Sequence, residues 1–388
     1  AQLNAVVKVA ELTLVPDFDR FAVAAFFLAD PNALGVVAIG TKGRGAACAD
    51  PFIAACLLIC MAKNQDLQLE DSATYSPTLL RNLEQLQDIF AYWQDYLGHN
   101  MHHIKIRGGT AKEEPFPCND KVSFFSGGVD GYHTYQQNQQ DIDYLLFAKG
   151  IDMQLSSDEL YQQAFACNQQ YLEKHHKLLY PIETNVRFLG YHNQLKWGVC
   201  FGGGLSSIAL ALGVKKCFIA AGLTYQNNVP EGSNYITDHL WSNHHTQIVH
   251  HGAEVRRIDK LKQLTQDQDF LKILRVCWHD HGYNCGECEK CLRTMSSLRL
   301  LGIETDSFPP LSDQLVKQKL RDQKLYNIHD VQFLEENLDQ AIAVNDTVMI
   351  EALQHIKHDF DMRALIKQAD ELILHGYAHK LKQLFVRH

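Results

Sequence analysis

The sequence predicts an α/β protein built around a doubly wound parallel sheet, with a smaller region on each side of it. Within residues 118–302, short apolar runs alternate with helical patterns, which is the order typical of parallel sheets covered by helices on both faces. One of these apolar runs leads directly into a glycine-rich turn. Residues 1–117 and 303–388 lack the alternation, so we expect an N-terminal accessory α+β domain and a C-terminal helical region.

The N-terminal region combines short apolar runs with two helical patterns. The runs predict strands of an accessory sheet, at 5–10, 21–28 and 36–39. Helices are expected at 51–64 and 79–96, the second with Ser76 as a plausible cap and apolar residues at helical spacing. Gly108 and Gly109, followed by two prolines, punctuate the chain, so we place a domain boundary near residue 117.

The central region supplies the main sheet. Its apolar runs predict strands at 122–125, 144–148, 181–184 and 216–221. Helices are expected directly after Asp130, across 157–174 and through 204–212. A further apolar run at 271–276 is expected to be a strand that leads into a cysteine-rich loop and then a helix at 289–301. Because ligands of such sheets bind beyond the carboxyl ends of the strands, we expect the functional site at that edge.

Residues 303–388 predict helices rather than strands. They are rich in Leu, Gln, Asp, Lys and His, and their apolar residues recur at helical spacing, first at Leu334, Leu338, Ala341 and Ile342 and again from Leu365 to Ile373. We expect a helical cap or a partner surface.

Composition excludes some classes of function. The chain has 388 residues, 46% of them hydrophobic and 21% charged, with a formal net charge of −9 and a pI of about 6.1. Without a global basic field, binding of long nucleic acid is not expected, whereas a small substrate or a partner protein, including a second copy of the chain, fits. We expect no membrane segment and no secretory signal, and therefore a cytoplasmic protein.

The most informative segment is 121–131, Lys-Val-Ser-Phe-Phe-Ser-Gly-Gly-Val-Asp-Gly, where an apolar strand enters a turn. Gly127 and Gly128 lack the Cβ atoms that would keep phosphate oxygens away from backbone N–H groups. Ser126 adds a hydroxyl donor, Asp130 can hold Mg²⁺, and the following helix directs its positive end at the anion. An ordinary strand-to-helix turn is the alternative, and we favour phosphate binding because the five-residue pattern is rare by chance.

The run from Ser126 to Asp130 resembles the signature loop of the PP-loop ATP pyrophosphatases. That resemblance implies cleavage of ATP to AMP and pyrophosphate. It assigns nucleotide contacts to the six consecutive residues Ser126, Gly127, Gly128, Val129, Asp130 and Gly131. The family usually has Ser or Thr where this chain has Gly131, so one phosphate contact is missing.

Four cysteines predict a metal site. Cys277, Cys285, Cys288 and Cys291 form two overlapping Cys-x2-Cys steps and one more distant ligand, a spacing suited to a structural tetrahedral Zn²⁺. An iron–sulfur cluster or a redox thiol pair is the main alternative, and His279 or His281 could replace one cysteine. The other seven cysteines lack such spacing and suit a reducing compartment.

The order and separation of the glycine turn and the cysteine set resemble 7-cyano-7-deazaguanine synthase, over residues 118–302. That family uses ATP to activate a carboxylate on a deazaguanine, and ammonia then converts it through an amide to a nitrile. The resemblance implies a carboxylate or deazapurine-like substrate. The additional terminal regions suggest a diverged relative with a different acceptor, and a protein acceptor is included.

Weaker candidates lie between these motifs. Gly202, Gly203 and Gly204 are expected to open a helix whose N-terminus nucleotide approaches, with Gly204 and Ser206 as contacts, although close helix packing is equally expected. The polar loop 222–238 is a candidate acceptor site through Ser233 and Asp238.

The histidines and arginines outside these motifs give weaker evidence of function. The histidine pairs 244–245 and 250–251 are expected to be surface or hydrogen-bonded residues, because adjacent residues of an extended segment point to opposite faces. Arg293 and Arg299 are expected to contact a phosphate, a carboxylate or salt-bridge partners.

Taken together, these features predict an adenylating enzyme that needs ATP, Mg²⁺ and Zn²⁺ and joins an activated carboxylate or carbonyl oxygen to a nitrogen nucleophile. Ser126, Asp130 and Asp238 are the expected catalytic residues. The alternatives are a PP-loop sulfurtransferase acting on tRNA and a non-catalytic nucleotide-binding assembly module.

Overall fold

The computed structural model describes residues 48–113, 118–279 and 282–373, and, earlier in the chain, the backbone of three short strands. These are β1 (Ala5–Val7), β2 (Phe26–Phe27) and β3 (Ile39–Gly40), which coincide with parts of the three predicted N-terminal runs. The rest of those runs, His281 and the chain beyond residue 373 lie outside the described residues.

The main sheet is parallel, as predicted. Five strands run in the same direction in the order β12-β11-β8-β9-β10, and β3 pairs antiparallel with β10 at one edge. The five strands are β8 (Lys121–Phe124), β9 (Tyr144–Lys149), β10 (Leu178–Thr184), β11 (Lys216–Ala220) and β12 (Gln247–His251). The fifth, β12, is not among the strands predicted from the sequence.

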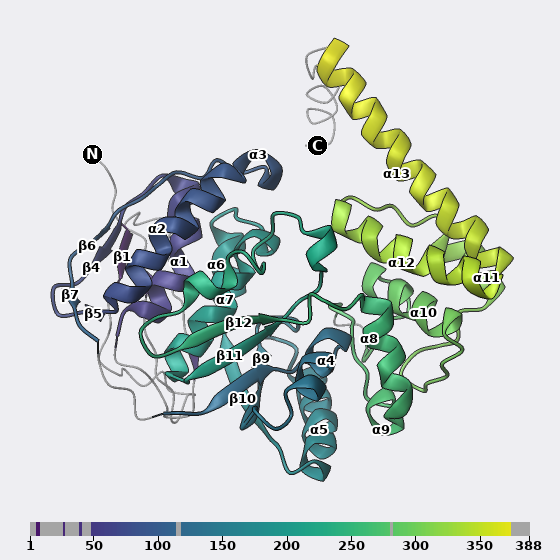
Figure 1. Cartoon of the computed structure of the whole chain (residues 1–388), viewed down its shortest axis with the longest axis horizontal. Helices are drawn as coiled ribbons and strands as arrows, with labels where there is room; N and C mark the ends of the chain where they lie inside the picture. Colours follow the sequence, from purple (N-terminus) through teal and green to yellow (C-terminus); the bar gives the residue numbers. More distant parts are fainter. Residues whose placement is uncertain are drawn as a thin grey trace.

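Helices cover both faces of this sheet (Figure 1). One face carries α4 (Val129–Gln137) and α5 (Asp158–Lys174), which share a hydrophobic cluster with the helices near the C-terminus. The other face carries α1 (Asp50–Lys63) and α7 (Trp197–Leu212), which share a second cluster. The sheet is therefore doubly wound, and α6 (Val186–His192) connects β10 to α7.

The strand order reverses beside β8. From β8 the chain proceeds through α4 to β9 and then β10 on one side, whereas β11 and β12 lie on the other side. At such a switch point the connections leave on opposite faces and open a crevice at the carboxyl edge, where ligands of these folds bind. The glycine turn of residues 126–131 follows β8 and thus lies at the switch point.

The N-terminal region is joined to the central sheet rather than separate from it. Its α1 is buried along almost its whole length and packs with α7 in one cluster, so the boundary predicted near residue 117 does not separate two hydrophobic cores.

The expected second helix is α2 (Pro77–Tyr92), capped by the Ser76 hydroxyl, which accepts from Leu79 N at 3.4 Å. The remaining elements are α3 (Gln94–Leu97), β4 (Leu67–Leu69), β5 (Thr74–Tyr75), β6 (Ile106–Arg107) and β7 (Thr110–Ala111).

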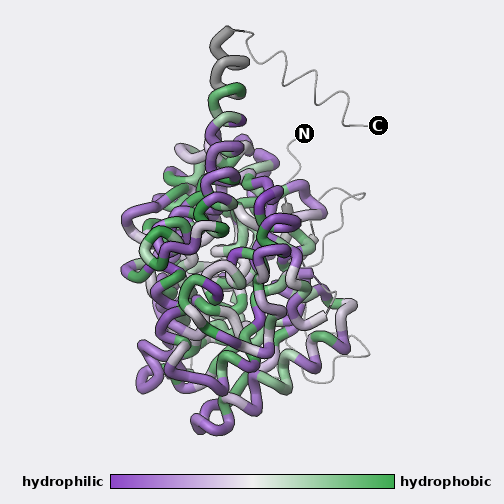
Figure 2. The backbone as a smooth tube through the Cα atoms, turned by 90° about the vertical axis from the view of Figure 1, so that its right-hand side faces the viewer, coloured by the Kyte–Doolittle hydropathy of each residue, from purple (hydrophilic) through white to green (hydrophobic). Residues whose placement is uncertain are grey.

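The region after β12 is helical. It contains α8 (Arg257–Gln263), α9 (Gln268–Leu271), α10 (Glu289–Leu300), α11 (Asp313–Leu315), a π-helical turn (Val316–Leu320), α12 (Ile328–Val344) and α13 (Thr347–Ile373). The outer part of α13 projects from the body (Figures 1 and 2), with Leu365 and Ile366 57% and 63% exposed. Within the described ranges, no helix is long and apolar enough to cross a membrane.

Two local predictions are wrong. Residues 272–276 form no strand but an irregular segment after α9, so Cys277 is reached from a loop. Gly202, Gly203 and Gly204 do not open a helix, because α7 begins at Trp197 and they lie inside it. A Cβ on Gly203 would lie 2.6 Å from the Ala54 carbonyl oxygen of α1, so this glycine lets two helices approach closely.

Candidate functional site

The turn after β8 requires glycine for two different reasons. Gly127 has φ +82°, a left-handed conformation that other residues adopt at a cost, and a Cβ there would lie 2.9 Å from Asn168 Oδ1. Gly131, in the first turn of α4, is close to the strand it follows, because a Cβ there would lie 3.2 Å from the Phe124 carbonyl oxygen. Because α4 lies close to the end of β8, a residue with a side chain at position 131 would be crowded, and this explains why the Ser or Thr hydroxyl of the family is missing here.

The N-terminus of α4 opens at this turn. Gly128 is the N-cap residue in extended conformation, and the first N–H groups of a helix have no partner within it. A Cβ on Gly128 would lie in ordinary van der Waals contact with the Arg275 carbonyl oxygen at 3.5 Å and with Ser126 Oγ at 3.6 Å, so this glycine is not required by packing. Backbone donors and the helix dipole at a helix N-terminus favour the binding of phosphate.

Asp130 is paired with two cations. Its Oδ2 contacts the Arg257 guanidinium, and its Oδ1 lies 3.3 Å from Lys260 Nζ. Burial alone would raise the pKa of Asp130, but Arg257 and Lys260 outweigh that effect and lower it. The carboxylate is therefore ionised, and both of its oxygens are engaged by side chains rather than presented for a metal ion.

Basic residues from three separate segments lie near the turn. Arg257 and Lys260 of α8 and Arg293 of α10 each lower the pKa of Asp130, and Arg275 of the loop after α9 contacts Gly127 through its backbone. Lys290 of α10 adds a further positive charge close to Arg257 and Arg293. Arg293 pairs with Glu289 at 3.2 Å and stacks on Phe333 of α12, with Cζ 4.1 Å from the ring centroid. Burial, with Arg257 as the next cause, lowers the pKa of Arg293, which is the effect expected where cations crowd together.

Arg275 forms no ion pair with any residue in the described ranges. It is 3% exposed, and its backbone N–H donates to the Gly127 carbonyl oxygen at 2.9 Å, which fixes it beside the turn. Its Nε and Nη2 atoms are buried and have no hydrogen-bond partner in the part of the chain that the structure describes. Burying unpaired N–H groups of a charged side chain is costly, and a bound anion that reached them would remove that cost.

The four cysteines meet in one cluster. Their Sγ atoms all lie within 4.8 Å of one another, and the separations Cys277–Cys288 and Cys285–Cys291 are 3.8 and 3.9 Å. Tetrahedral Zn²⁺ with Zn–S bonds of about 2.3 Å requires S···S separations of about 3.8 Å, so the donor set fits this ion. Four sulfur ligands also suit an iron–sulfur cluster.

Local backbone geometry supports these ligands. Backbone N–H groups of Cys288 and Cys291 approach the Sγ atoms of Cys285 and Cys288 at 3.2 and 3.5 Å, and Gly286 takes φ +70° in the knuckle between them. Hydrogen bonding, first from Cys291, lowers the pKa of Cys288 to about 5, which favours a thiolate. Cys288 is also the N-cap of α10, so a metal here would fix the helix that carries Lys290 and Arg293.

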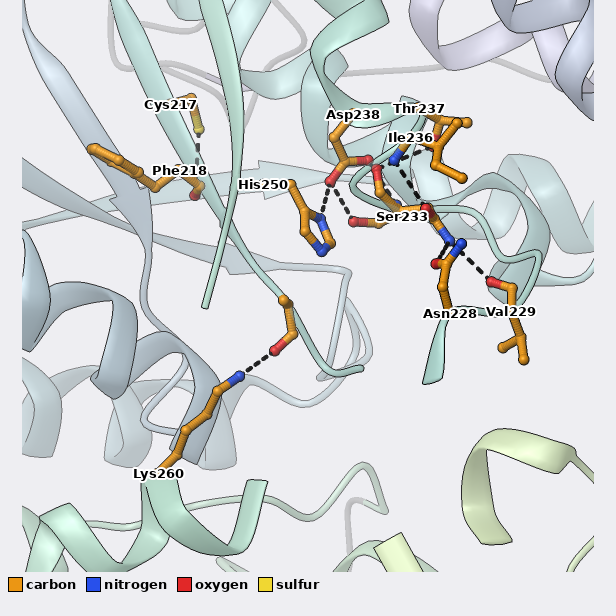
Figure 3. A network of polar contacts seen from close by, with 12 residues as sticks. Cys217, Phe218, Asn228, Val229, Ser233, Ile236, Thr237, Asp238, His250 and Lys260 are labelled. Carbon is orange, nitrogen blue, oxygen red and sulfur yellow. Dashed lines mark hydrogen bonds and ion pairs between the residues drawn. The ribbon is translucent and has the colours of Figure 1, made fainter. Parts of the chain in front are cut away.

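Ser233 and Asp238, the candidate acceptor residues, lie together, and His250, which was not predicted to belong to this site, contacts Asp238 (Figure 3). The Ser233 hydroxyl donates to Asp238 Oδ2 at 2.7 Å, and His250 Nδ1 lies 2.7 Å from the same oxygen. Asp238 is fully buried and Ser233 is 2% exposed. The only sequence signal for His250 is its position at the carboxyl end of a strand that was itself missed.

The histidine pairs 244–245 and 250–251 consist of hydrogen-bonded residues, as predicted. On β12, His250 points toward Asp238 whereas His251 points to α4, where it contacts Thr134 and Asn138, so the two occupy opposite faces. His245 Nε2 lies 2.7 Å from the Cys118 carbonyl oxygen. His279 contributes its backbone N–H to Cys277 Sγ at 3.4 Å.

Other predicted contacts are not part of this site. Gly204 and Ser206 lie in the interior of α7, where a Cβ on Gly204 would be 2.7 Å from the Trp197 ring and Ser206 is fully buried. Neither is at a helix N-terminus, so we leave both out of the site. Arg299 reaches carboxylates, through two hydrogen bonds of 2.8 and 3.0 Å to Asp346, and ties α10 to the start of α13.

Two cavities lie away from the turn. One of about 620 Å³ is lined by Tyr132, His175, Asp267 and several glutamines on the outside of α4. Another of about 410 Å³ lies beside Lys149 and Glu183, near the carboxyl ends of β9 and β10. Neither is lined by a residue of 126–131.

Comparison with known proteins adds nothing to this geometry. No protein-family model, no curated protein sequence and no solved structure matches the chain. Any function must therefore be argued from its own residues.

Proposed function

We propose that this protein is an ATP-dependent adenylating enzyme of the PP-loop type, similar to 7-cyano-7-deazaguanine synthase. It would activate a carboxylate or carbonyl oxygen as its AMP ester, release pyrophosphate, and let a nitrogen nucleophile displace AMP. One observation carries the proposal: Arg275, whose buried guanidinium has no counterion among the described residues, is hydrogen-bonded through its backbone to a glycine turn at the switch point of a parallel sheet.

The surroundings of the turn suit the leaving pyrophosphate. The N–H groups of the turn and of α4 would bind its oxygens, and Arg275, Lys290 and Arg293 would offset the charge that develops as it departs. Such catalysis works through position and electrostatics and needs no protein nucleophile.

Asp130 has a role different from the one expected from sequence. Because it pairs with Arg257 and Lys260, it holds these two cations in place rather than offering a free carboxylate. Mg²⁺, which supplies charge neutralisation when bound, would be held mainly by the phosphates of the substrate, as is common for this ion. The four-cysteine site would be structural and would hold α10 in position.

Product analysis tests the proposal. Purified protein is incubated with Mg-ATP, with and without a carboxylated deazaguanine and ammonium, and the nucleotide products are separated. We expect AMP and pyrophosphate in the native protein and a loss of at least about 100-fold in Arg275→Gln. Arg321→Gln is the matched control, because Arg321 is exposed.

Other outcomes separate the alternatives. ADP and phosphate as products would contradict adenylation. Tight nucleotide binding without any turnover would favour a non-catalytic binding module. AMP formation that depends on tRNA and a sulfur donor would favour the sulfurtransferase, although the cysteine cluster described above is a closed set rather than a reactive thiol.

A further inference from the structure

His250 lies at the carboxyl end of β12 with one ring nitrogen engaged. Its side chain is 10% exposed, and the contact of Nδ1 with Asp238 is the only hydrogen bond of this ring among the described residues. A carboxylate only accepts hydrogen bonds, so in the neutral ring Nδ1 carries the proton. Nε2 then keeps its lone pair, which is the form in which an imidazole accepts a proton.

Asp238 is held rigidly behind this ring. Its Oδ2 also accepts from the Ser233 hydroxyl (Figure 3), and its Oδ1 accepts from the Asn234 backbone N–H at 3.1 Å. Asn234 is fixed in turn by the Val229 carbonyl oxygen, 3.0 Å from its Nδ2. A buried carboxylate that orients an imidazole and fixes its tautomer is the arrangement that makes histidine an effective general base.

The register of the sheet puts this ring at the same edge as the glycine turn. His250 pairs with Ile219 of β11, and the preceding residue of β11, Phe218, pairs with Ser123 of β8. The backbone of His250 is therefore level with the end of β8 and two strands away from it, a backbone separation of about 10 Å.

Lys260 links the two parts of the edge. Its Nζ lies 3.3 Å from Asp130 Oδ1 and donates to the Ala221 carbonyl oxygen at 2.6 Å, and Ala221 N donates to His251 at 2.8 Å. The spacing between the turn and the end of β12 is thus fixed by buried contacts rather than by mobile side chains. From the end of β12 the His250 ring extends toward Asp238, on the face opposite His251.

We propose that His250 is the general base that takes the proton from the nitrogen nucleophile, with Asp238 as its positioning residue. This inference rests on the proposed function. The amine nitrogen forms a bond to the activated carbon of the acyl adenylate, one N–H proton passes to His250 Nε2, and the C–O bond to AMP breaks. The oxygen and the bonding electron pair leave with AMP, so the products are an amide, AMP and a protonated His250.

The test separates the two half-reactions. Carboxylate-dependent exchange of labelled pyrophosphate into ATP reports adenylation, and amide formation from ammonium reports the second step. His250→Gln should keep exchange within about threefold of the native rate and lose at least about 100-fold in amide formation. Asp238→Asn should form amide at a rate between those of the native protein and His250→Gln. The double variant should form amide no more slowly than His250→Gln, because the two residues act as a unit. His239→Gln is the matched control, being exposed and next to Asp238.

The outcomes distinguish the two proposals. If the native protein shows no exchange with the carboxylated deazaguanine, the proposed function fails and this inference fails with it. If native exchange is present but His250→Gln forms amide at the native rate, only the inference is wrong. Retained exchange in the variants also serves as the evidence that they are folded.

Discussion

Replacing Arg275 by methionine should make the free protein more stable while removing its affinity for pyrophosphate. Methionine has a similar length and no charge. Two buried N–H groups, Nε and Nη2, have no partner among the described residues, and each unsatisfied buried donor costs about 1–3 kcal/mol. Allowing for imperfect packing of the new side chain, Arg275→Met should gain about 1–2 kcal/mol in the free energy of unfolding.

The matched control is Arg299→Met, which should have the opposite sign. Arg299 forms two hydrogen bonds with Asp346 and a salt bridge of 2.8 Å with Asp313. Its removal leaves a partly buried carboxylate without its partner, and the side chain is 20% exposed, so we expect a loss of about 1–3 kcal/mol.

Urea unfolding followed by tryptophan fluorescence measures both variants, without and with inorganic pyrophosphate. Pyrophosphate should raise the unfolding midpoint of the native protein and of Arg299→Met but not that of Arg275→Met. A loss of stability in Arg275→Met equal to that in Arg299→Met would refute the reasoning, because it would mean that the guanidinium has a structural partner. An unchanged response to pyrophosphate would refute its role at the turn.

Three further predictions concern the turn, the cysteines and Asp130. Gly127→Ala should lose about 2–4 kcal/mol in urea unfolding, from the left-handed backbone and the contact with buried Asn168, whereas Gly98→Ala, with φ +67° and no atom within 4 Å of its Cβ, should lose only about 1 kcal/mol; equal losses would contradict the steric argument. The purified protein should contain one equivalent of zinc by elemental analysis, and Cys285→Ser should lose the metal and lower the melting temperature by several degrees; iron with visible absorbance would instead indicate a cluster. Because Arg257 and Lys260 lower the pKa of Asp130 against the effect of burial, the ion pairs stabilise the folded state above about pH 4, and this contribution is lost as the pH falls through the folded pKa. Asp130→Asn should therefore be less stable than the native protein at pH 7 by about 1–3 kcal/mol and show a smaller deficit at pH 2; an equal deficit at both values would contradict the linkage.

Sequence reasoning succeeded where a local pattern admits one structure. The alternation of apolar runs and helices predicted the parallel sheet, because strands buried on both faces must be apolar throughout. The strand and helix on either side of Gly127 were also predicted, since glycine pairs between an apolar run and a helical pattern mark a tight turn.

The errors arose where one pattern fits two structures. A run of three glycines can open a helix or let two helices pack closely, and only the presence of α1 against α7 shows that the second applies to Gly203. The strand β12 was missed because its sequence is largely polar and only Ile248 is fully buried in the core. The run 271–276 is apolar because it is buried, and not because it is a strand.

The sequence by itself determined the two local structural motifs of this protein. The glycine turn of residues 126–131 and the cysteine knuckle of residues 285–291 are each encoded by spacing within a short segment, where backbone geometry decides the structure. Only the tertiary structure decided what surrounds them. Arg275 beside Gly127, and His250 beside Asp238, depend on strand order and loop packing, and a charged residue in a sequence does not indicate which partner it meets. Burial then sets whether such a residue is a solvated charge or part of a site, because the cost of an unpaired polar group appears only when water is excluded.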